Sequence, residues 1–334
     1  MTKQRIVTMD RNTSPILPLT DGQIERAVKA TSFNLYPEEE IKTFKRLYAK
    51  RNQFSPDYIE LANGSDEWLQ KFILTFGQNG VMTLNPDFVM YQVYSQQVAV
   101  PFHQIACRAD FQFDFDDIER DIQAYRPSLF LISNPHNPTG RLFTESELER
   151  LAAAMAAVDG YLVIDEAYGE FAPDYQRPTG AHVIIVRTLS KIYGLAGLRI
   201  GIAIAEEATF EQLTRFNHPY PVNSVSLNLA NELFSDDDHL NDFIAYQQQS
   251  KQRLEAALKT VDKWLTIVPS KSNFIFTYGE RAPELAAFLL ERGYQARQYD
   301  EALLKQAVRY SIIALEDYDG FEQALREWSE QIDS

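Results

Sequence analysis

Three short segments concentrate the side chains that can carry chemistry. They are residues 134–140 (Asn-Pro-His-Asn-Pro-Thr-Gly), 164–168 (Ile-Asp-Glu-Ala-Tyr) and 187–199, which contains Lys191. A lysine that follows an apolar run is a candidate amine nucleophile, because apolar surroundings disfavour its ammonium form. Asp165 ends another apolar run, and a buried carboxylate needs a cationic partner. A protonated pyridine nitrogen is a group that meets this need.

A second set of residues suits a phosphate group. Ser190 and Arg199 flank the lysine, and an arginine binds a phosphate through two parallel hydrogen bonds. Gly64, Ser65 and Asp66 lie at an expected strand-to-helix junction. The free backbone N–H groups of a helix N-terminus bind anions. These residues are therefore candidates for a phosphate cup.

Asn137 and Tyr168 supply neutral hydrogen bonds of the kind that hold a phenolate oxygen. An amine, a partner for a pyridine nitrogen, a phosphate cup and a phenolate clamp together describe a site for pyridoxal 5′-phosphate. The histidines are scattered without the spacing of metal ligands, so no metal is expected. His136 is expected to pack within its turn.

The apolar pattern indicates the elements that must position these residues. Continuous apolar runs, typical of strands covered on both faces, occur at residues 58–62, 80–84, 129–133, 161–164, 182–186 and 198–205. Helices are expected at 64–76 and at 145–158, where Thr144 and Glu147 form a capping box. This alternation favours an α/β fold, a mostly parallel sheet with helices on both faces. Each chemical segment follows a strand, at the carboxyl edge where ligands bind.

The pattern divides the chain into an N-terminal arm at 1–33, a large α/β domain at 34–222 and a small α+β domain at 223–334. The first 35 residues are expected to be irregular. A long helix over 224–261 is expected to connect to the small domain. Further elements are expected there at 273–277, 283–292, 294–297, 307–313 and from 317 onward.

Composition narrows the class of protein. The 334 residues include 32 Lys and Arg against 47 Asp and Glu, a net charge of −15, which disfavours a nucleic-acid binder because such proteins need a basic face. Cys107 is the single cysteine, so an intrachain disulfide is excluded and a reducing compartment is favoured. The first ten residues lack a signal-peptide core, and no apolar run reaches membrane-spanning length. We therefore expect a cytoplasmic protein without a membrane partner.

From about residue 34 to the C-terminus, the sequence resembles the fold-type I pyridoxal-phosphate aminotransferases, in their histidinol-phosphate aminotransferase branch. The resemblance rests on the motifs at 134–140 and 165–168 and on Thr-Leu-Ser-Lys at 188–191, in this order. It implies the fold of that family, with the cofactor held on Lys191 as an internal aldimine and Asp165 beside the ring nitrogen. It also implies that Lys191, Asp165 and Tyr168 are catalytic, and that Asn137, Tyr168, Ser65, Asp66, Ser190 and Arg199 bind the cofactor.

Four further positions take their roles from the resemblance. Tyr36 matches a tyrosine that reaches the cofactor phosphate of the partner subunit, which implies a homodimer with shared active sites. Phe88 falls where the family stacks a tyrosine on the cofactor ring. Arg309 matches the arginine that binds the acidic group of the substrate, and Arg297 falls at a second anion-binding arginine.

The sequence departs from the family at residues 10–15, Asp-Arg-Asn-Thr-Ser-Pro, where the family has an Asn-Glu-Asn-Pro motif after a longer arm. That arm contributes a tyrosine near the substrate phosphate. Phe88 also lacks the usual hydroxyl group. Both differences lead us to expect a reduced preference for histidinol phosphate.

The expected activity is reversible transamination, in which Lys191 moves the proton of the donor Cα and 2-oxoglutarate then takes the amino group. The donor stays open among histidinol phosphate, another phosphorylated amine and an aromatic amino acid. An alternative is a lyase that resembles threonine-phosphate decarboxylase and uses the same cofactor residues. A cofactor-binding regulator would need an added basic DNA-binding domain, and a non-catalytic binding protein would be expected to lack Lys191 or Asp165.

Overall fold

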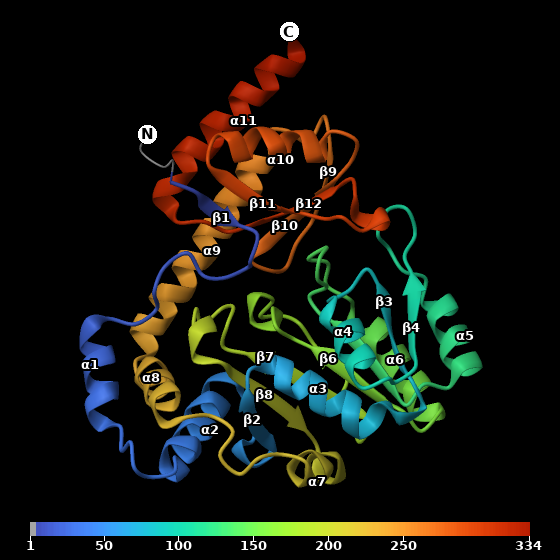
Figure 1. Cartoon of the computed structure of the whole chain (residues 1–334), viewed down its shortest axis with the longest axis vertical. Coiled ribbons are helices and arrows are strands. Elements are labelled where there is room, and N and C mark those ends of the chain that lie inside the picture. Colours follow the sequence, from blue (N-terminus) through green and yellow to red (C-terminus); the bar gives the residue numbers. More distant parts are fainter. Residues whose placement is uncertain (1–4) are drawn as a thin grey trace.

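The computed structural model describes residues 5–334, so the first four residues of the expected arm lie outside the described residues. The chain forms a large sheet and a small sheet, each covered by helices (Figure 1). No helix in this described part is both long and apolar enough to cross a membrane.

The large sheet is mostly parallel, as the sequence predicts. Across the described chain it has seven strands, and β8 runs antiparallel to both of its neighbours while the others run parallel. The strand order is β2 (Ile59–Asn63), β8 (Ile200–Ala205), β7 (Val183–Thr188), β6 (Tyr161–Asp165), β5 (Leu129–Ser133), β3 (Val81–Asn85) and β4 (Phe102–Ala106).

Helices cover both faces of the large sheet, which explains the continuous apolar runs. In β5, Leu129 and Leu131 pack against one layer of helices, whereas Phe130 and Ile132 pack against the other. Alternate residues of a strand point to opposite faces, so a strand covered on both sides is apolar throughout. The first layer contains α3 (Ser65–Phe76), α4 (Met90–Gln97) and α7 (Glu207–Arg215). The second contains α2 (Glu38–Asn52), α5 (Phe115–Tyr125), α6 (Glu145–Ala157) and α8 (Ser224–Phe234).

The small sheet lies above the carboxyl edge of the large one in Figure 1. Its order is β1 (Val7–Met9), β11 (Tyr294–Gln298), β12 (Ala307–Ser311), β10 (Phe274–Tyr278) and β9 (Thr266–Val268). The helices α10 (Ala282–Glu291), α11 (Tyr318–Asp333) and the second half of α9 (Asp237–Lys259) share its core. The capping box of α6 is present as predicted, with Thr144 accepting the Glu147 N–H.

Two expectations outside the large sheet are wrong. The first 35 residues are not irregular, because β1 pairs with β11 and the helix α1 (Asp21–Ala30) begins at a capping box of Thr20 and Gln23. The helix expected over 224–261 is interrupted between α8 and α9. Ser235 Oγ donates to the Asn231 carbonyl and the Asp236 side chain accepts the His239 N–H, so both side chains compete for backbone groups that a continuous helix would use.

The helix α9 connects the two cores. Phe243 in its first half packs in the core with β2, β7 and β8, and Leu254 in its second half packs with the small sheet. Its 23 residues span about 34 Å at a rise of 1.5 Å per residue. This shared helix holds the small sheet over the edge at which β5, β6 and β7 end.

Candidate active site

The candidate site lies where three parallel strands end. Ser133 of β5 is level with Asp165 of β6, and Asp165 is level with Val186 of β7. The residues that follow these strands therefore meet at one edge of the sheet. A cavity of about 260 Å³ lies at this edge. It is lined by Thr13, Ser65, Asp66, Phe88, Ser133, Asn137, Asp165, Ala167, Tyr168, Thr188, Ser190, Lys191, Ala196 and Arg199.

Asp165 presents a buried carboxylate to this cavity. Its Oδ2 accepts the hydroxyl of Tyr91 at 2.9 Å, and its Oδ1 accepts the Ala167 N–H at 3.0 Å. Burial raises the pKa of Asp165 to about 6, although the hydrogen bond from Tyr91 acts in the opposite direction. Among residues 5–334, no lysine or arginine forms a salt bridge with this carboxylate. The Asp165 carboxylate therefore lacks a cationic partner within the described chain, and a cation that enters the cavity could pair with it.

Lys191 and Tyr168 lie next to each other in the lining of the cavity. The Lys191 amine lies 5.6 Å from the centre of the Tyr168 ring, a distance typical of a cation–π contact. The edge of the Tyr168 ring packs on Phe274, which begins β10 of the small sheet. The amine of Lys191 is therefore placed over the ring of Tyr168.

One end of the cavity, where the sequence predicts a phosphate cup, depends on two glycines. Gly64 has a left-handed φ of +85° at the N-terminus of α3, and a Cβ there would lie 2.3 Å from Nη2 of Arg199. A Cβ on Gly201 would lie 2.3 Å from the Ser65 nitrogen. Arg199 Nη2 donates to Asp66 Oδ2 at 3.0 Å, and its Nη1 lies 3.5 Å from Ser190 Oγ. The missing side chains let the helix N-terminus, the serines and the guanidinium converge as an anion cradle.

The arginine expected to bind substrate reaches the cavity through Asn137. Nη1 of Arg309 donates to Oδ1 of Asn137 at 2.7 Å, which leaves the Asn137 Nδ2 group as a donor. Nη2 of Arg309 donates to the Asp10 carbonyl at 3.0 Å. Arg297 is exposed and lies directly opposite Arg309 in the antiparallel pair of β11 and β12.

Two predicted residues occupy different surroundings. Phe88 lines the cavity, with its ring edge-on to Tyr91. Tyr36 does not line it, because its side chain is 73% exposed and stacks on Tyr220 at 4.5 Å between ring centres. Within this single chain, the structure therefore brings together the expected cofactor residues except Tyr36.

Several residues of the site belong to no motif of the sequence. Tyr91 bonds Asp165, and Asn12 Nδ2 donates to the Tyr168 hydroxyl at 2.8 Å. The side chain of Asp87 is buried and accepts the Ser133 hydroxyl, and Ser133 in turn accepts the Asn137 N–H. Except for the local bond between Asn137 and Ser133, these contacts join residues far apart in the chain, and no local spacing indicates them.

His136 has the packing role that the sequence predicts. Its ring is fully buried, with Nε2 bonded to the Pro86 carbonyl and Nδ1 to the Thr139 hydroxyl. Burial lowers the pKa of His136 to about 4. The described residues contain no group of three or more His, Cys, Asp and Glu side chains that could hold a metal ion.

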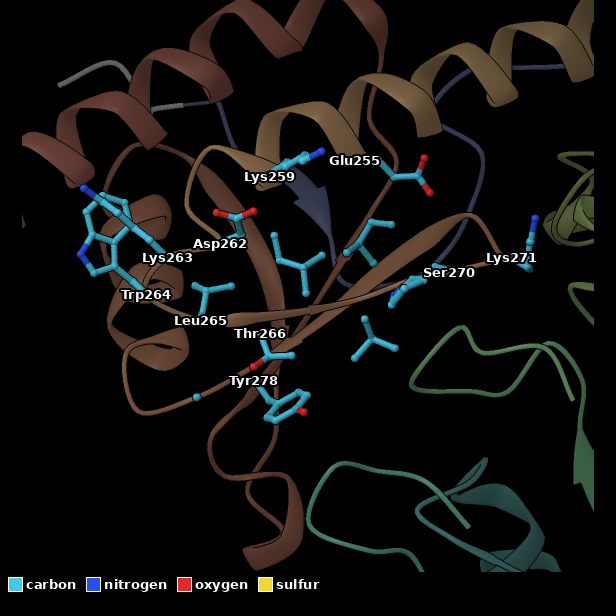
Figure 2. A pocket seen from close by; sticks show the side chains of 15 residues that line it. Glu255, Lys259, Asp262, Lys263, Trp264, Leu265, Thr266, Ser270, Lys271 and Tyr278 are labelled. Atoms are coloured by element: carbon cyan, nitrogen blue, oxygen red, sulfur yellow. The ribbon is translucent and has the colours of Figure 1, made fainter. Parts of the chain in front are cut away.

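A larger hollow of about 950 Å³ lies beside the small sheet (Figure 2). The end of α9 and the strands β9 and β10 form its walls, and Lys259, Lys263 and Lys271 are among its lining residues. It shares no lining residue with the cavity at the sheet edge, and none of the predicted cofactor residues belongs to it. The smaller cavity is therefore the candidate active site.

Similar proteins were found by sequence and by structure. The chain matches the family "Aminotransferase class I and II" over residues 10–326. It is 32% identical to a histidinol-phosphate aminotransferase of Thermoanaerobacter sp. (strain X514) over 327 residues, which cover 96% of this chain and 92% of that protein. The histidinol-phosphate aminotransferase of Sinorhizobium meliloti, solved in complex with pyridoxal-5′-phosphate, superposes with a TM-score of 0.82 at 23% identity, with 97% of this chain and 92% of that chain covered.

A second solved structure, the histidinol-phosphate aminotransferase of Clostridium acetobutylicum, gives a TM-score of 0.83 at 18% identity and covers 98% of this chain and all of that one. These structural similarities agree with a fold-type I architecture. The unpaired Asp165 carboxylate, the Lys191 amine and the glycine-lined anion cradle fit the ring nitrogen, the aldehyde and the phosphate of the family's cofactor. The chain therefore belongs to the class I and II aminotransferases, in their histidinol-phosphate aminotransferase branch, and its cofactor is pyridoxal 5′-phosphate.

Proposed function

We propose that this aminotransferase moves the amino group of a phosphorylated amine of the histidinol-phosphate kind, or of an aromatic amino acid, to 2-oxoglutarate. The observation that carries the proposal is the convergence of Lys191, Asp165 and Arg199 on one cavity. When bound, pyridoxal phosphate supplies an aldehyde that joins an amine covalently and a protonated ring nitrogen that withdraws electrons from the substrate Cα. The names of the relatives at about 30% identity support a donor of this kind.

Lys191, Asp165 and Tyr168 are the residues to which we assign the chemistry. The amine of Lys191 would hold the cofactor through its aldehyde group. Once the donor amine has taken that place, the freed Lys191 amine would accept the proton from the donor Cα and act as the proton carrier of the reaction. The Asp165 carboxylate holds the proton on the ring nitrogen, since a cation at this place offsets the burial that raises the pKa of Asp165 to about 6. Tyr168 and Asn137 donate hydrogen bonds to the phenolic oxygen.

The remaining residues orient the two ligands. We assign Gly64, Ser65, Asp66, Ser190 and Arg199 to the cofactor phosphate and Phe88 to the face of its ring; these roles are supported by the lining of the cavity and by the glycine positions.

The arginine pair supports a donor with an anionic group. Arg297 and Arg309 lie directly opposite each other, so their side chains leave the sheet on the same face. Like charges in this arrangement destabilise a sheet, and an anion between them removes the repulsion. Nε of Arg309 is buried and has no hydrogen-bond partner in the described chain. We therefore assign Arg309, assisted by Arg297, to the phosphate or carboxylate of the donor.

A donor screen tests the proposed reaction. Holoenzyme is incubated with 2-oxoglutarate and, in turn, with histidinol phosphate, phenylalanine and tyrosine, while glutamate and carbon dioxide are measured in parallel. We expect glutamate without carbon dioxide, and none from Lys191→Ala. Carbon dioxide without glutamate, tested with phosphothreonine as the donor, would instead support the threonine-phosphate decarboxylase alternative.

The assignment of Lys191 has its own test. Borohydride reduction of the loaded protein is expected to fix the cofactor on the peptide that contains Lys191, as read by mass spectrometry. In Lys191→Ala, bound cofactor should no longer be reducible onto the chain. Fixation on any other lysine would contradict the assignment.

We also propose that the protein is a cytoplasmic homodimer in which Tyr36 completes the partner's site. Phe33, Leu35 and Tyr36 are 76%, 65% and 73% exposed in one subunit. Apolar side chains gathered in this way are typical of a protein–protein interface. The division into an arm at 1–33 and domains at 34–222 and 223–334 remains a prediction.

A further inference from the structure

The segment from Asp10 to Ser14 passes directly beside the cavity. It follows β1 of the small sheet, and Thr13 lines the cavity. Asn12 is 2% exposed and has a left-handed φ of 56°, a conformation in which asparagine is enriched. This residue is buried between the two domains and is in direct contact with the proposed catalytic phenol.

Ser311 fixes the orientation of the Asn12 amide. The Ser311 hydroxyl accepts the Asn12 backbone N–H at 3.0 Å and lies 2.7 Å from the Asn12 Oδ1. A hydroxyl has one proton, and the Asn12 oxygen is its acceptor in this arrangement. Rotating the amide by half a turn would put an NH₂ group there and deprive that proton of its acceptor. The amide oxygen therefore faces Ser311, and the amide nitrogen faces Tyr168.

This orientation determines what the Tyr168 hydroxyl can do. The Asn12 Nδ2 group donates to the Tyr168 oxygen at 2.8 Å, so Tyr168 is the acceptor in that bond. Its own proton is not used by Asn12, and across residues 5–334 no hydrogen bond gives that proton an acceptor. Tyr168 lines the cavity, so the proton remains available to a ligand there. A hydrogen bond received by a hydroxyl also strengthens the bond that it donates.

We propose that Asn12 is a positioning residue that directs the Tyr168 proton toward the phenolic oxygen of the cofactor. The inference rests on the proposed function of the site. It also gives a role to a segment whose sequence differs from the family motif at this place. Because Ser311 belongs to β12 and Asn273 Nδ2 donates to the Asn12 carbonyl at 3.0 Å, the small domain takes part in this arrangement.

The variant Asn12→Asp tests the direction of the bond with almost no change of shape. A carboxylate oxygen replaces the donor, so the Tyr168 proton turns toward it and away from the cofactor. The measurement is the pH midpoint of the cofactor's visible absorption band in substrate-free holoenzyme. We expect the midpoint to rise by about one pH unit, the size expected for one lost hydrogen bond to a charged oxygen.

A double-mutant cycle with Tyr168→Phe separates this effect from the charge of the new carboxylate. If Asn12 acts through the Tyr168 proton, most of the rise should disappear in the Tyr168→Phe background. An equal rise in both backgrounds is a simple charge effect and would overturn the proposal. The same cycle with Asn12→Leu introduces no buried charge. We expect a smaller rise of the pH midpoint, which again depends on Tyr168.

Asn273→Ala is the matched control for a merely structural role. It removes the bond to the Asn12 carbonyl and leaves the amide beside Tyr168, so we expect a lower melting temperature with an unchanged midpoint. A midpoint that rises as much as in Asn12→Asp would contradict the proposal. Failure of the proposed function is distinguishable, because a protein that does not bind the cofactor on Lys191 would show no titrating band in any variant.

Discussion

The carboxyl group of Asp165 is an unfavourable feature of the cofactor-free protein. It is buried, and burial raises its pKa to about 6, against about 3.9 in an unfolded chain. Because the folded pKa is the higher one, the unfolded state releases this proton first as the pH rises. The free energy of unfolding therefore falls as the pH rises from about 4 to about 6, because ionisation of Asp165 favours the unfolded state, and it stays lower above that range.

Asp165→Asn should separate stability from activity. The amide keeps the shape and cannot ionise, so we expect the free energy of unfolding of the cofactor-free protein at pH 7.5 to increase by up to about 3 kcal/mol. Turnover of the loaded enzyme should fall by orders of magnitude, since the proposed partner of the ring nitrogen is lost. Denaturant unfolding at pH 7.5 and at pH 4 checks the first part, and the gain should vanish at pH 4. An equal gain at both pH values would show that ionisation of Asp165 is not its source.

The close approach of β8 to the start of α3 shapes the proposed phosphate cradle. Gly201 lies in β8, and a Cβ there would meet backbone atoms of Gly64 and Ser65 at 2.2–2.4 Å. Backbone cannot yield as the end of a flexible side chain can. A methyl group at this position must therefore push the N-terminus of α3 away from Arg199.

Gly201→Ala should consequently weaken cofactor binding as well as the fold. Overpacking of this kind costs about 1–3 kcal/mol, and we expect both a lower melting temperature and a weaker affinity for pyridoxal phosphate by equilibrium dialysis. Gly197→Ala is the matched control, because a Cβ at Gly197 meets no atom within 4 Å. Equal behaviour of the two variants would mean that the contact of β8 with α3 does not control the cradle.

If Tyr36 acts in the site of a partner subunit, the cavity of a single subunit is incomplete, and only the assembled dimer provides a full site. Tyr36 and Tyr220 stack on each other at the surface, outside their own cavity. The exposed Phe33 and Leu35 precede Tyr36 in the chain. A second subunit that covers this patch would bury it and bring the Tyr36 hydroxyl within reach of a cofactor phosphate.

Mixed dimers test this arrangement. Tyr36→Phe alone should be impaired, since a hydrogen bond to a charged group contributes roughly 1.5–3 kcal/mol. Hybrids of Tyr36→Phe with Lys191→Ala contain one site with both defects and one with neither. We therefore expect activity to return after subunit exchange, with hybrids verified by native mass spectrometry. Verified hybrids that remain inactive would assign Tyr36 to its own subunit.

The local sequence pattern was sufficient to predict the parallel strands and the polar residues that follow them. The runs that became β5, β6 and β7 are apolar throughout because helices cover both faces, and Asn137, Asp165 and Lys191 come directly after or at the end of these strands. The helix α1 was also detectable, since Thr20 and Gln23 form the same capping box as Thr144 and Glu147. Periodicity and capping depend on neighbours in the chain, so the sequence carries them.

Contacts between distant segments carry no such signal. The three-residue strand β1 exists because β11, almost 290 residues later, offers it a free edge. Tyr91 reaches Asp165 from α4, and Asn12 reaches Tyr168 across the gap between the two sheets. The positions of Lys191 and Asp165 at the sheet edge could therefore be predicted from the order of residues along the strands. The partners that orient the acid and the phenol follow from chain packing, because a hydrogen bond depends on the distance between atoms in space and not on their separation in the sequence.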